Sequence, residues 1–312
     1  MVKKNEELHQ PVLLAEVLQG LSLKVDGFYI DATFGRGGHS KQILEHLGDQ
    51  GRLVVIDQDP QAIAVAKEQW GFDPRVIIRF GSFVNLQQWI SELGWRGKID
   101  GILLDLGVSS PQLDDAERGF SFQKEGPLDM RMDPNITVDA ATWLSKAKES
   151  EIAKVLQELG EERFSFRIAR AIVKERQHNP IRTTTQLAKL IISVVPFQKR
   201  DKHPATRSFQ AIRIYINREL AAIDSVLPQC LEVLAKSGRL VVISFHSLED
   251  NRVKQFVQYW SQGGTLPDLP IPENQLQRRL RLVDRLIRPS NDEVNRNPRA
   301  RSARCRVMEK MK

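Results

Sequence analysis

The sequence predicts an α/β fold, in which a doubly wound, mostly parallel sheet carries an inserted helical domain. Short apolar runs alternate with helical patterns up to residue 106, and such alternation is typical of a parallel sheet with right-handed crossovers. The alternation then stops, and several helical patterns follow one another before a further apolar run begins at residue 239. With 312 residues, of which 41% are hydrophobic, the chain can bury a sizeable core.

Five apolar runs are the predicted parallel strands. They span Phe28–Ile30, Arg52–Ile56, Val76–Phe80, Ile99–Leu106 and Arg239–Phe245. Helices are predicted over Pro60–Trp70 and Leu86–Leu93, where apolar residues recur at helical spacing. After the fifth run, Ser247–Asp250 resembles a capping box that begins a helix to Tyr259. A Pro- and Gly-rich linker is expected over Gly263–Pro272, and Ser302–Met308 is expected to add an edge strand.

The region between the fourth and fifth strands is predicted to be a helical insertion. Its helical patterns cover Ala140–Ala147, Glu151–Leu159, Arg163–Gln177, Thr185–Val194 and Ser208–Leu227. Before them, Gly107–Asn135 is rich in Gly, Ser, Pro and Asp, and a loop of that length is expected to be functional or to pack on a ligand. We therefore divide the chain into the first part of a strand-bearing domain (1–112), the insertion (113–213), and the second part of that domain with a basic tail (214–312).

A glycine turn follows the first predicted strand. The strand leads into Asp31, and the glycines of residues 35–38 then allow the backbone to approach a ligand that a Cβ atom would block. About 20 residues further on, Asp57 follows the second strand, where a carboxylate can accept both hydroxyls of a ribose. Acids here can also cap helices, and we assign that role to Asp59, because Pro60 follows it at a first helical position. The unit predicts an adenosine-cofactor half-site on a Rossmann-like sheet.

Two adenosine cofactors compete for this half-site. A dinucleotide fingerprint requires G-x-G-x-x-G, and Gly35 and Gly37 fit it, whereas Ser40 occupies the third glycine place. The pyrophosphate interpretation is weakened but stays open. The alternative pattern is an acid, three residues and G-x-G, which begins at Asp31 and resembles the first motif of S-adenosylmethionine-dependent methyltransferases. The sulfonium of that cofactor is a cation, so carboxylates at the strand ends favour it electrostatically.

The composition excludes several classes of protein. No apolar run approaches the ~20 residues that a membrane-spanning helix needs, and no secretory signal is visible at the start of the sequence. Cys230 and Cys305 form neither a metal-ligand spacing nor a disulfide framework. His39, His203 and His246 lack the paired spacing of a zinc site, so no metal is predicted. His246 is expected to be held in its own turn rather than to line a pocket. We expect a cytoplasmic protein.

The net charge of +7 is concentrated in two segments. Residues 163–213 contain twelve Lys or Arg and two acids, and residues 273–312 contain twelve Lys or Arg and five acids. A solvated helix face explains many short charge runs, but two long basic segments beside a cofactor fold favour a polyanion partner. We therefore expect the insertion and the tail to bind nucleic acid.

Transfer of a methyl group from a sulfonium depends on alignment more than on acid–base chemistry, because the donor is already activated. Catalytic groups should lie where the fourth strand meets the cofactor, near Asp105, Ser109 and Ser110. Oxygen acceptors there would draw on the N–H groups of an aromatic amine and help its lone pair to attack. The serines can instead bond their own turn, and both roles stay open. Methylation at carbon five of a pyrimidine usually needs a cysteine nucleophile, and neither cysteine lies near a strand end.

Nine strings of the sequence together carry a resemblance to a known family. They are His9–Leu14, Asp31–Ser40, Ile56–Ile63, Asp100–Asp114, Arg118–Phe122, Pro127–Asp133, His203–Arg213, Ser244–Asp250 and Asn297–Ser302. In this order they resemble the bacterial 16S ribosomal RNA cytosine-N4 methyltransferases, the MraW or RsmH family. The resemblance implies a seven-stranded class I methyltransferase sheet with a substrate-recognition insertion, and S-adenosylmethionine as cofactor. It also implies methylation of the exocyclic nitrogen of a cytosine in the decoding centre of the small ribosomal subunit.

The resemblance also assigns residues. It implies cofactor contacts at Gly37, Gly38, His39, Asp57, Phe83, Asp105 and Gln112. The residue patterns alone lead to the glycine turn, Asp57 and Asp105, but not to Gln112, and Phe83 is equally well explained as a core aromatic. Many amino-methyltransferases of bases carry an acidic or polar residue followed by Pro-Pro and an aromatic, whereas residues 105–108 read D-L-G-V. The catalytic acceptor is therefore not assigned by the resemblance.

Two other functions remain open at this level. The same half-site would serve a nicotinamide dehydrogenase, which titration of both cofactors would distinguish. A non-catalytic ribosome-assembly factor could keep the fold, which methyl incorporation into small subunits would distinguish. The sequence also leaves open whether the substrate is naked RNA or an assembled particle, whether a metal assists, and whether the chain forms a homodimer.

Overall fold

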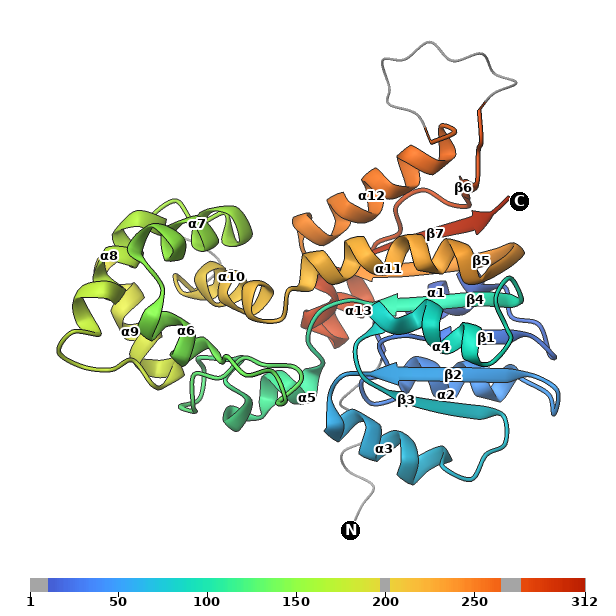
Figure 1. Cartoon of the computed structure of the whole chain (residues 1–312), viewed down its shortest axis with the longest axis horizontal. Helices are drawn as coiled ribbons and strands as arrows, with labels where there is room; N and C mark the ends of the chain where they lie inside the picture. The colour runs from blue at the N-terminus through green and yellow to red at the C-terminus, as the bar shows by residue number, and fades with distance from the viewer. Residues whose placement is uncertain (1–10, 197–202, 265–275, 312) are drawn as a thin grey trace. The chain divides into compact units, whose positions relative to one another are not determined.

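The computed structural model describes residues 11–196, 203–264 and 276–311 (Figure 1). The chain divides into two compact units, one formed by residues 1–107 with 220–312 and the other by residues 108–219. We call them the sheet unit and the helical unit. The predicted insertion, 113–213, lies inside the helical unit. The start of the His9–Leu14 string and most of the predicted linker Gly263–Pro272 lie outside the described residues.

The sheet unit contains a seven-stranded sheet in the order β3-β2-β1-β4-β5-β7-β6. Its strands are β1 (Phe28–Asp31), β2 (Arg52–Asp57), β3 (Val76–Phe80), β4 (Ile99–Asp105), β5 (Leu234–Ser244), β6 (Leu280–Leu282) and β7 (Arg304–Lys310). The first five are parallel, and β7 runs antiparallel to both β5 and β6. The predicted doubly wound, mostly parallel sheet of Rossmann type is therefore confirmed.

Helices connect the strands and cover the sheet. In the sheet unit they are α1 (Leu14–Leu21), α2 (Gly38–His46), α3 (Pro60–Trp70), η2 (Phe83–Asn85), α4 (Leu86–Glu92), α12 (Ser247–Ser261), α13 (Asn291–Arg296) and η5 (Pro298–Ser302), with α11 (Glu219–Val233) entering from the helical unit. Strands β1, β2, β4 and β5 are mostly buried, with Ile30, Leu53 and Leu103 fully inaccessible to solvent. Burial on both faces explains why these strands are continuous apolar runs rather than alternating ones.

The helical unit has its own core. Its helices are α5 (Ser110–Asp114), η3 (Ala116–Arg118), α6 (Ala140–Lys146), α7 (Glu149–Gly160), α8 (Ser165–Glu175), α9 (Thr184–Val194) and α10 (Thr206–Ile216). Each longer helix buries one apolar stripe, as with Ile152, Ile168 and Leu187, which are fully buried in one cluster. No described helix is both long enough and apolar enough to cross a membrane.

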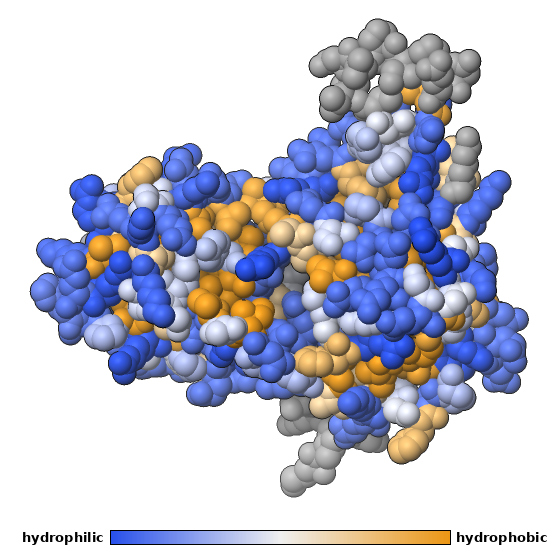
Figure 2. Space-filling view, in the orientation of Figure 1, coloured by the Kyte–Doolittle hydropathy of each residue, from blue (hydrophilic) through white to orange (hydrophobic). Residues whose placement is uncertain are grey.

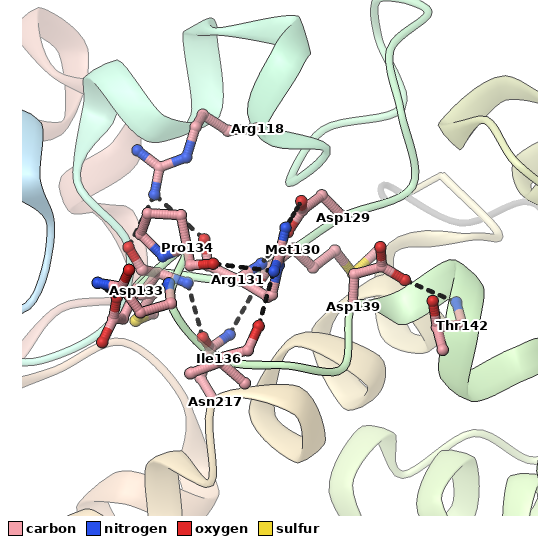
Figure 3. Close-up of polar contacts among 12 residues, drawn as sticks. Arg118, Asp129, Met130, Arg131, Asp133, Pro134, Ile136, Asp139, Thr142 and Asn217 are labelled. Carbon is pink, nitrogen blue, oxygen red and sulfur yellow. Dashed lines mark hydrogen bonds and ion pairs between the residues drawn. The ribbon is translucent and has the colours of Figure 1, made fainter.

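The Gly-, Pro- and Asp-rich loop is held by its own polar contacts within the helical unit (Figure 3). Arg131 forms a bidentate ion pair with Asp129, at 2.6 and 2.8 Å, and donates to the carbonyls of Pro134 and Ile136. Asn217 accepts the Met132 N–H and donates to the Met130 carbonyl, each at 2.8 Å. A loop with few helical residues is thus fixed by side chains that satisfy its backbone.

Three predictions about local structure were wrong. The single helix expected over Ser208–Leu227 is two helices, α10 and α11, because Arg218 has a positive φ of 50° that a helix does not tolerate. The residue that caps α12 is His246 rather than Ser247, and Glu249 completes the box. The C-terminal strand β7 is not at the edge, because β6, which has only three residues and no clear pattern, pairs outside it.

Candidate active site

Three carboxylates end adjacent strands of the sheet. Asp31 ends β1, Asp57 ends β2 and Asp105 ends β4. Strand β1 lies between the other two, and Asp31 is in register with Val55 on one side and Leu103 on the other. Because the carboxyl ends of parallel strands meet at one edge, the three acids gather there, where open α/β sheets bind ligands.

The glycine turn is fastened to Asp57. The Gly35 N–H donates to Asp57 Oδ2 at 2.7 Å, and the Asp59 N–H donates to Oδ1 at 2.8 Å. Gly35 and Gly37 have positive φ values of 58° and 78°, which explains why glycine is needed at both places. Each Asp57 oxygen accepts one backbone bond and retains a lone pair, so the carboxylate remains able to accept two neighbouring hydroxyls of a ribose. Asp59 caps α3 through the Gln61 N–H, as predicted.

Asp31 forms hydrogen bonds with residues on both sides of the glycine turn. It is almost completely buried, and it accepts the Ser40 hydroxyl at 2.6 Å and the Thr33 N–H at 3.2 Å. These bonds hold the first turn of α2 against the end of β1. Its pKa is raised by burial, although the hydrogen bonds from Ser40 and Thr33 oppose the rise. Asp31 is therefore a supporting residue whose carboxylate adds negative potential to the pocket.

His39 and Asp105 lie close together at the edge of the sheet. His39 Nε2 lies 3.0 Å from the Val12 carbonyl, which can only accept, so the proton is on Nε2. Burial lowers the pKa of His39 and keeps the ring neutral. Nδ1 is then an acceptor, 3.9 Å from Asp105 Oδ2. The other oxygen, Oδ1, is buried and has no hydrogen-bond partner among the described residues.

The acids of this edge are poised to receive a cation. Burial raises the pKa of Asp105 to about 8, with further contributions from the charges of Asp31 and Glu249. Burial likewise raises the pKa of Asp57 to about 6. A positively charged ligand would relieve the mutual repulsion and favour ionised carboxylates. Such a ligand would stabilise an arrangement that is otherwise costly.

The residues present fit a sulfonium-bearing nucleoside. A Cβ atom on Gly38 would lie 2.5 Å from Pro11 Cγ, so the turn leaves space for backbone alone. The first turn of α2 offers N–H groups to an anionic end of the ligand. Asp57 matches the ribose, and the unpartnered oxygen of Asp105 matches a positive centre or an N–H donor. These are the demands of S-adenosylmethionine, with its carboxylate, sugar and charged sulfur.

Comparison with known proteins decides the family. The sequence profile of the MraW methylase family matches residues 6–311. The chain belongs to the MraW methylase family. Among curated members, the Ribosomal RNA small subunit methyltransferase H of Coxiella burnetii (strain Dugway 5J108-111) is 53% identical over 98% of this chain and 99% of its own. The protein of the same name from Shewanella baltica (strain OS155 / ATCC BAA-1091) is 54% identical over 98% of each chain.

Solved structures align with nearly the whole chain but share little of its sequence. A protein of Clostridium thermocellum, named as a putative rRNA methylase, is 10% identical, covers 98% of this chain and 99% of its own, and has a TM-score of 0.46. A protein of Streptococcus mutans, named as a putative methyltransferase and solved with S-adenosylhomocysteine, is 13% identical, covers 97% of this chain and 100% of its own, and has a TM-score of 0.44. As a member of the MraW methylase family, this chain uses S-adenosylmethionine, and the predicted cofactor is confirmed.

The other residues predicted for the MraW methylase site divide between the two units. Phe83 lies in η2, directly after β3, and is partly buried, which places it at the same edge of the sheet as the acids. Ser109, Ser110 and Gln112 belong to the helical unit. There, Gln112 Oε1 accepts the Ser109 N–H at 2.9 Å as part of a capping box of α5. This supports the interpretation that Ser109 bonds its own turn. Catalytic roles for Ser109 and Ser110 stay predictions.

Sequence reasoning missed several supporting groups. Thr33 Oγ1 accepts the Asp105 N–H at 2.6 Å and so joins the ends of β1 and β4. The Val12 carbonyl fixes the tautomer of His39, and Ser40 holds Asp31. Thr33 and Ser40 both lie within the Asp31–Ser40 string, which was a usable signal. Val12 likewise lies within the His9–Leu14 string, but its contact with His39 depends on tertiary packing, which the string does not show. His246 is held in its turn by the Glu249 N–H, as expected.

Proposed function

We propose that this MraW methylase methylates the exocyclic N4 of a cytosine in the decoding centre of 16S ribosomal RNA. Three structural features support the proposal: the acid-lined edge for a sulfonium, the unpartnered Asp105 oxygen, and basic surfaces on both units. The observation that carries it is the buried Oδ1 of Asp105, which has no hydrogen-bond partner among the described residues and lies at the end of β4, next to the end of β1 at Asp31. A pocket of this kind favours a cationic donor over a neutral or anionic one.

Asp105 is the residue we assign to the reacting amine. When bound, S-adenosylmethionine supplies a methyl group already activated by its positive sulfur. Asp105 Oδ1 can accept an N4–H of cytosine and direct the nitrogen lone pair toward that methyl group. The N–C bond forms as the S–C bond breaks, and the surplus amine proton passes to the carboxylate or to solvent. His39, held neutral, offers no competing positive charge.

The cysteines favour nitrogen over carbon as the methyl acceptor. Cys230 in α11 and Cys305 in β7 are fully buried. Burial raises the pKa of both thiols, that of Cys305 to about 12. Methylation at carbon five needs a reactive thiolate that adds to the ring, and neither thiol meets that requirement. A neutral exocyclic amine needs only an acceptor and alignment.

An arginine-bearing segment lies at the same edge of the sheet as the acids. Strand β7 runs antiparallel to β5, with Arg304 opposite Ser244, so the preceding η5 lies at the carboxyl end of β5. Glu293 accepts the Leu13 N–H at 2.7 Å and fixes α13 beside the start of α1. Arg301 is exposed and has no ion-pair partner among the described residues. Such a cation suits the phosphates that flank a base drawn into the pocket.

The test is methylation of small ribosomal subunits that lack this modification. Purified protein is incubated with them and tritiated S-adenosylmethionine, and the RNA is digested for mass spectrometry of its nucleosides. We expect N4-methylcytidine at one position of 16S RNA. A different methylated nucleoside would overturn the N4 assignment, and no incorporation would favour a non-catalytic assembly factor. Parallel reactions with naked 16S RNA and with the particle identify which one is the substrate.

A further inference from the structure

Helix α8 of the helical unit presents a basic stripe. Arg167, Arg170 and Lys174 are exposed and follow one another at three- and four-residue spacing, so they share one face of the helix. Arg163 is exposed in the turn that leads into the helix. The opposite face is buried in the core of the unit through Ile168, Ala169 and Ile172, none of which is accessible to solvent. Polar side chains cover most of this end of the unit (Figure 2).

An exposed aromatic ring lies within the stripe. Phe166 leaves 62% of its surface in solvent, although burying such a side chain would stabilise the fold by about 1.5–3 kcal/mol. It precedes Arg167 and lies one turn from Arg170, so cations flank it along the helix. Because Phe166 is so exposed, it is not part of the core of the helical unit. Basic side chains interleaved with an aromatic are typical of surfaces that bind single-stranded nucleic acid.

The charges of the stripe are not used to hold the fold. Arg163, Arg167 and Lys174 have no ion-pair or hydrogen-bond partner among the described residues. Arg170 lies 3.6 Å from Glu149 but is 79% exposed, and a pair of that kind contributes little. Arg176, at the end of the same helix, is different: it donates to the Leu144 and Ala147 carbonyls at 2.5 and 2.7 Å. Arg176 thus supports the fold, whereas the cations of the stripe are either without a partner among the described residues or, for Arg170, in one exposed ion pair.

We propose that this stripe binds a single-stranded segment of the ribosomal RNA substrate. The four cations contact successive backbone phosphates, and Phe166 stacks on one unpaired base. The inference rests on the proposed function, because it names a surface that holds the same RNA outside the donor pocket. Ribosomal protein is the alternative partner. It fits the stripe less well, because the core of a protein interface is depleted in charged residues and centres on packed apolar anchors, whereas here a single aromatic lies among four cations.

The first experiment removes the charges in the full-length protein. The triple variant Arg163→Gln, Arg167→Gln, Lys174→Gln is compared with Lys67→Gln, Lys98→Gln, Lys236→Gln, which removes three exposed lysines from the sheet unit. Binding of unmethylated 16S RNA is measured over a range of salt concentrations. The slope of log affinity against log salt should fall by about 2 in the first variant and stay unchanged in the control. An unchanged slope in the first variant overturns the proposal.

The second experiment separates stacking from charge. Phe166→Ala should weaken RNA binding by about 5- to 100-fold with no change of salt slope, because a stacked base contributes roughly 1–3 kcal/mol. Phe166→Tyr should retain the affinity, whereas Phe166→Leu should resemble the alanine variant. Equal affinity for all four proteins would remove the stacking role. Thermal unfolding and the far-UV circular dichroism spectrum, both expected to be unchanged throughout, verify that the helical unit of each variant is folded.

Methylation of small subunits distinguishes this inference from the proposed function. The charge and stacking variants should raise KM for the particle and leave kcat at saturation near that of the unsubstituted protein. If the unsubstituted protein methylates nothing, the proposed function fails, while RNA binding still tests the stripe. If KM for the particle rises but binding of free RNA does not change, the stripe contacts ribosomal protein and the RNA assignment is wrong.

Discussion

Gly35 donates its backbone N–H to Asp57 Oδ2 at 2.7 Å. This bond ties the glycine turn after β1 to the end of β2, so one carboxylate both shapes the turn and faces the place predicted for the ribose. The same carboxylate also accepts the Asp59 N–H. A change at residue 57 therefore alters the pocket wall and the ligand contact together, and the two effects need separate readouts.

Asp57→Ala should weaken binding of S-adenosylmethionine by about ten- to a hundredfold, since a hydrogen bond to a charged group contributes roughly 1.5–3 kcal/mol. Asp57→Asn should lose less, because its amide oxygen can still accept one bond. Calorimetric titration of the donor measures both affinities. A donor affinity unchanged in Asp57→Ala would mean that the sugar lies elsewhere.

Asp59→Ala is the matched control for that prediction. Asp59 caps α3 by accepting the Gln61 N–H at 2.9 Å, so its loss should lower the free energy of unfolding by about 1 kcal/mol. Its backbone N–H still reaches Asp57, and donor affinity should hardly change. Thermal unfolding and titration of the same preparation separate the two roles.

Asp105 should make the unliganded protein less stable as the pH rises. Its folded-state pKa is about 8, above the ordinary 3.8, so between these values the folded state keeps a proton that the unfolded state has lost. The free energy of unfolding therefore falls as pH rises through that window. Asp105→Asn should flatten this slope. At pH 8 the free energy of unfolding of the variant should exceed that of the original protein by about 1 kcal/mol or more. Urea unfolding at several pH values measures both effects. A variant less stable than the original at pH 8 would contradict the burial argument.

The same residue should make donor binding depend on pH. Below about pH 8 the free protein must lose the Asp105 proton when the sulfonium binds. The affinity for S-adenosylmethionine should therefore rise with pH, by at most about tenfold per pH unit, and level off above the pKa of Asp105. Proton release measured by calorimetry in buffers of different ionisation enthalpy tests this directly. S-adenosylhomocysteine lacks the positive charge and should give a flatter profile. Identical profiles for the two ligands would exclude the electrostatic role.

The sequence predicted the parts of the site that depend on local pattern. Asp57 and Asp105 could be placed because each follows an apolar strand, and strand ends of a parallel sheet converge. The turn at residues 35–38 was recognised because backbone that must adopt positive φ is marked by glycine. These inferences needed only a parallel sheet, and β1 through β5 are parallel, as predicted.

The sequence did not predict contacts between segments that are distant along the chain. The Val12 carbonyl meets His39 because α1 packs against α2. Val12 lies in the His9–Leu14 string, but nothing in that string predicts which side chain its carbonyl contacts. Strand β6 is only three residues long and has two exposed positions, so pairing with β7 rather than hydrophobicity defines it. The break between α10 and α11 depends on the positive φ of Arg218, a residue type that gives no sign of a turn.

Asn217→Ala should destabilise the helical unit. Its side chain accepts the Met132 N–H and donates to the Met130 carbonyl, each at 2.8 Å, where the loop passes α10 (Figure 3). Met130 and Met132 are buried, and Met130 has a positive φ of 65°, so water cannot readily replace both bonds. We expect the free energy of unfolding to fall by about 1–3 kcal/mol, seen as a lower melting temperature and faster amide exchange in residues 129–133.

Asn135→Ala is the control, because Asn135 is exposed and bonds only to Asp133. The melting temperature of this variant should stay within a degree or so of that of the original protein. Equal melting temperatures for the two variants would show that the loop is held by Arg131 and its ion pair with Asp129 rather than by Asn217.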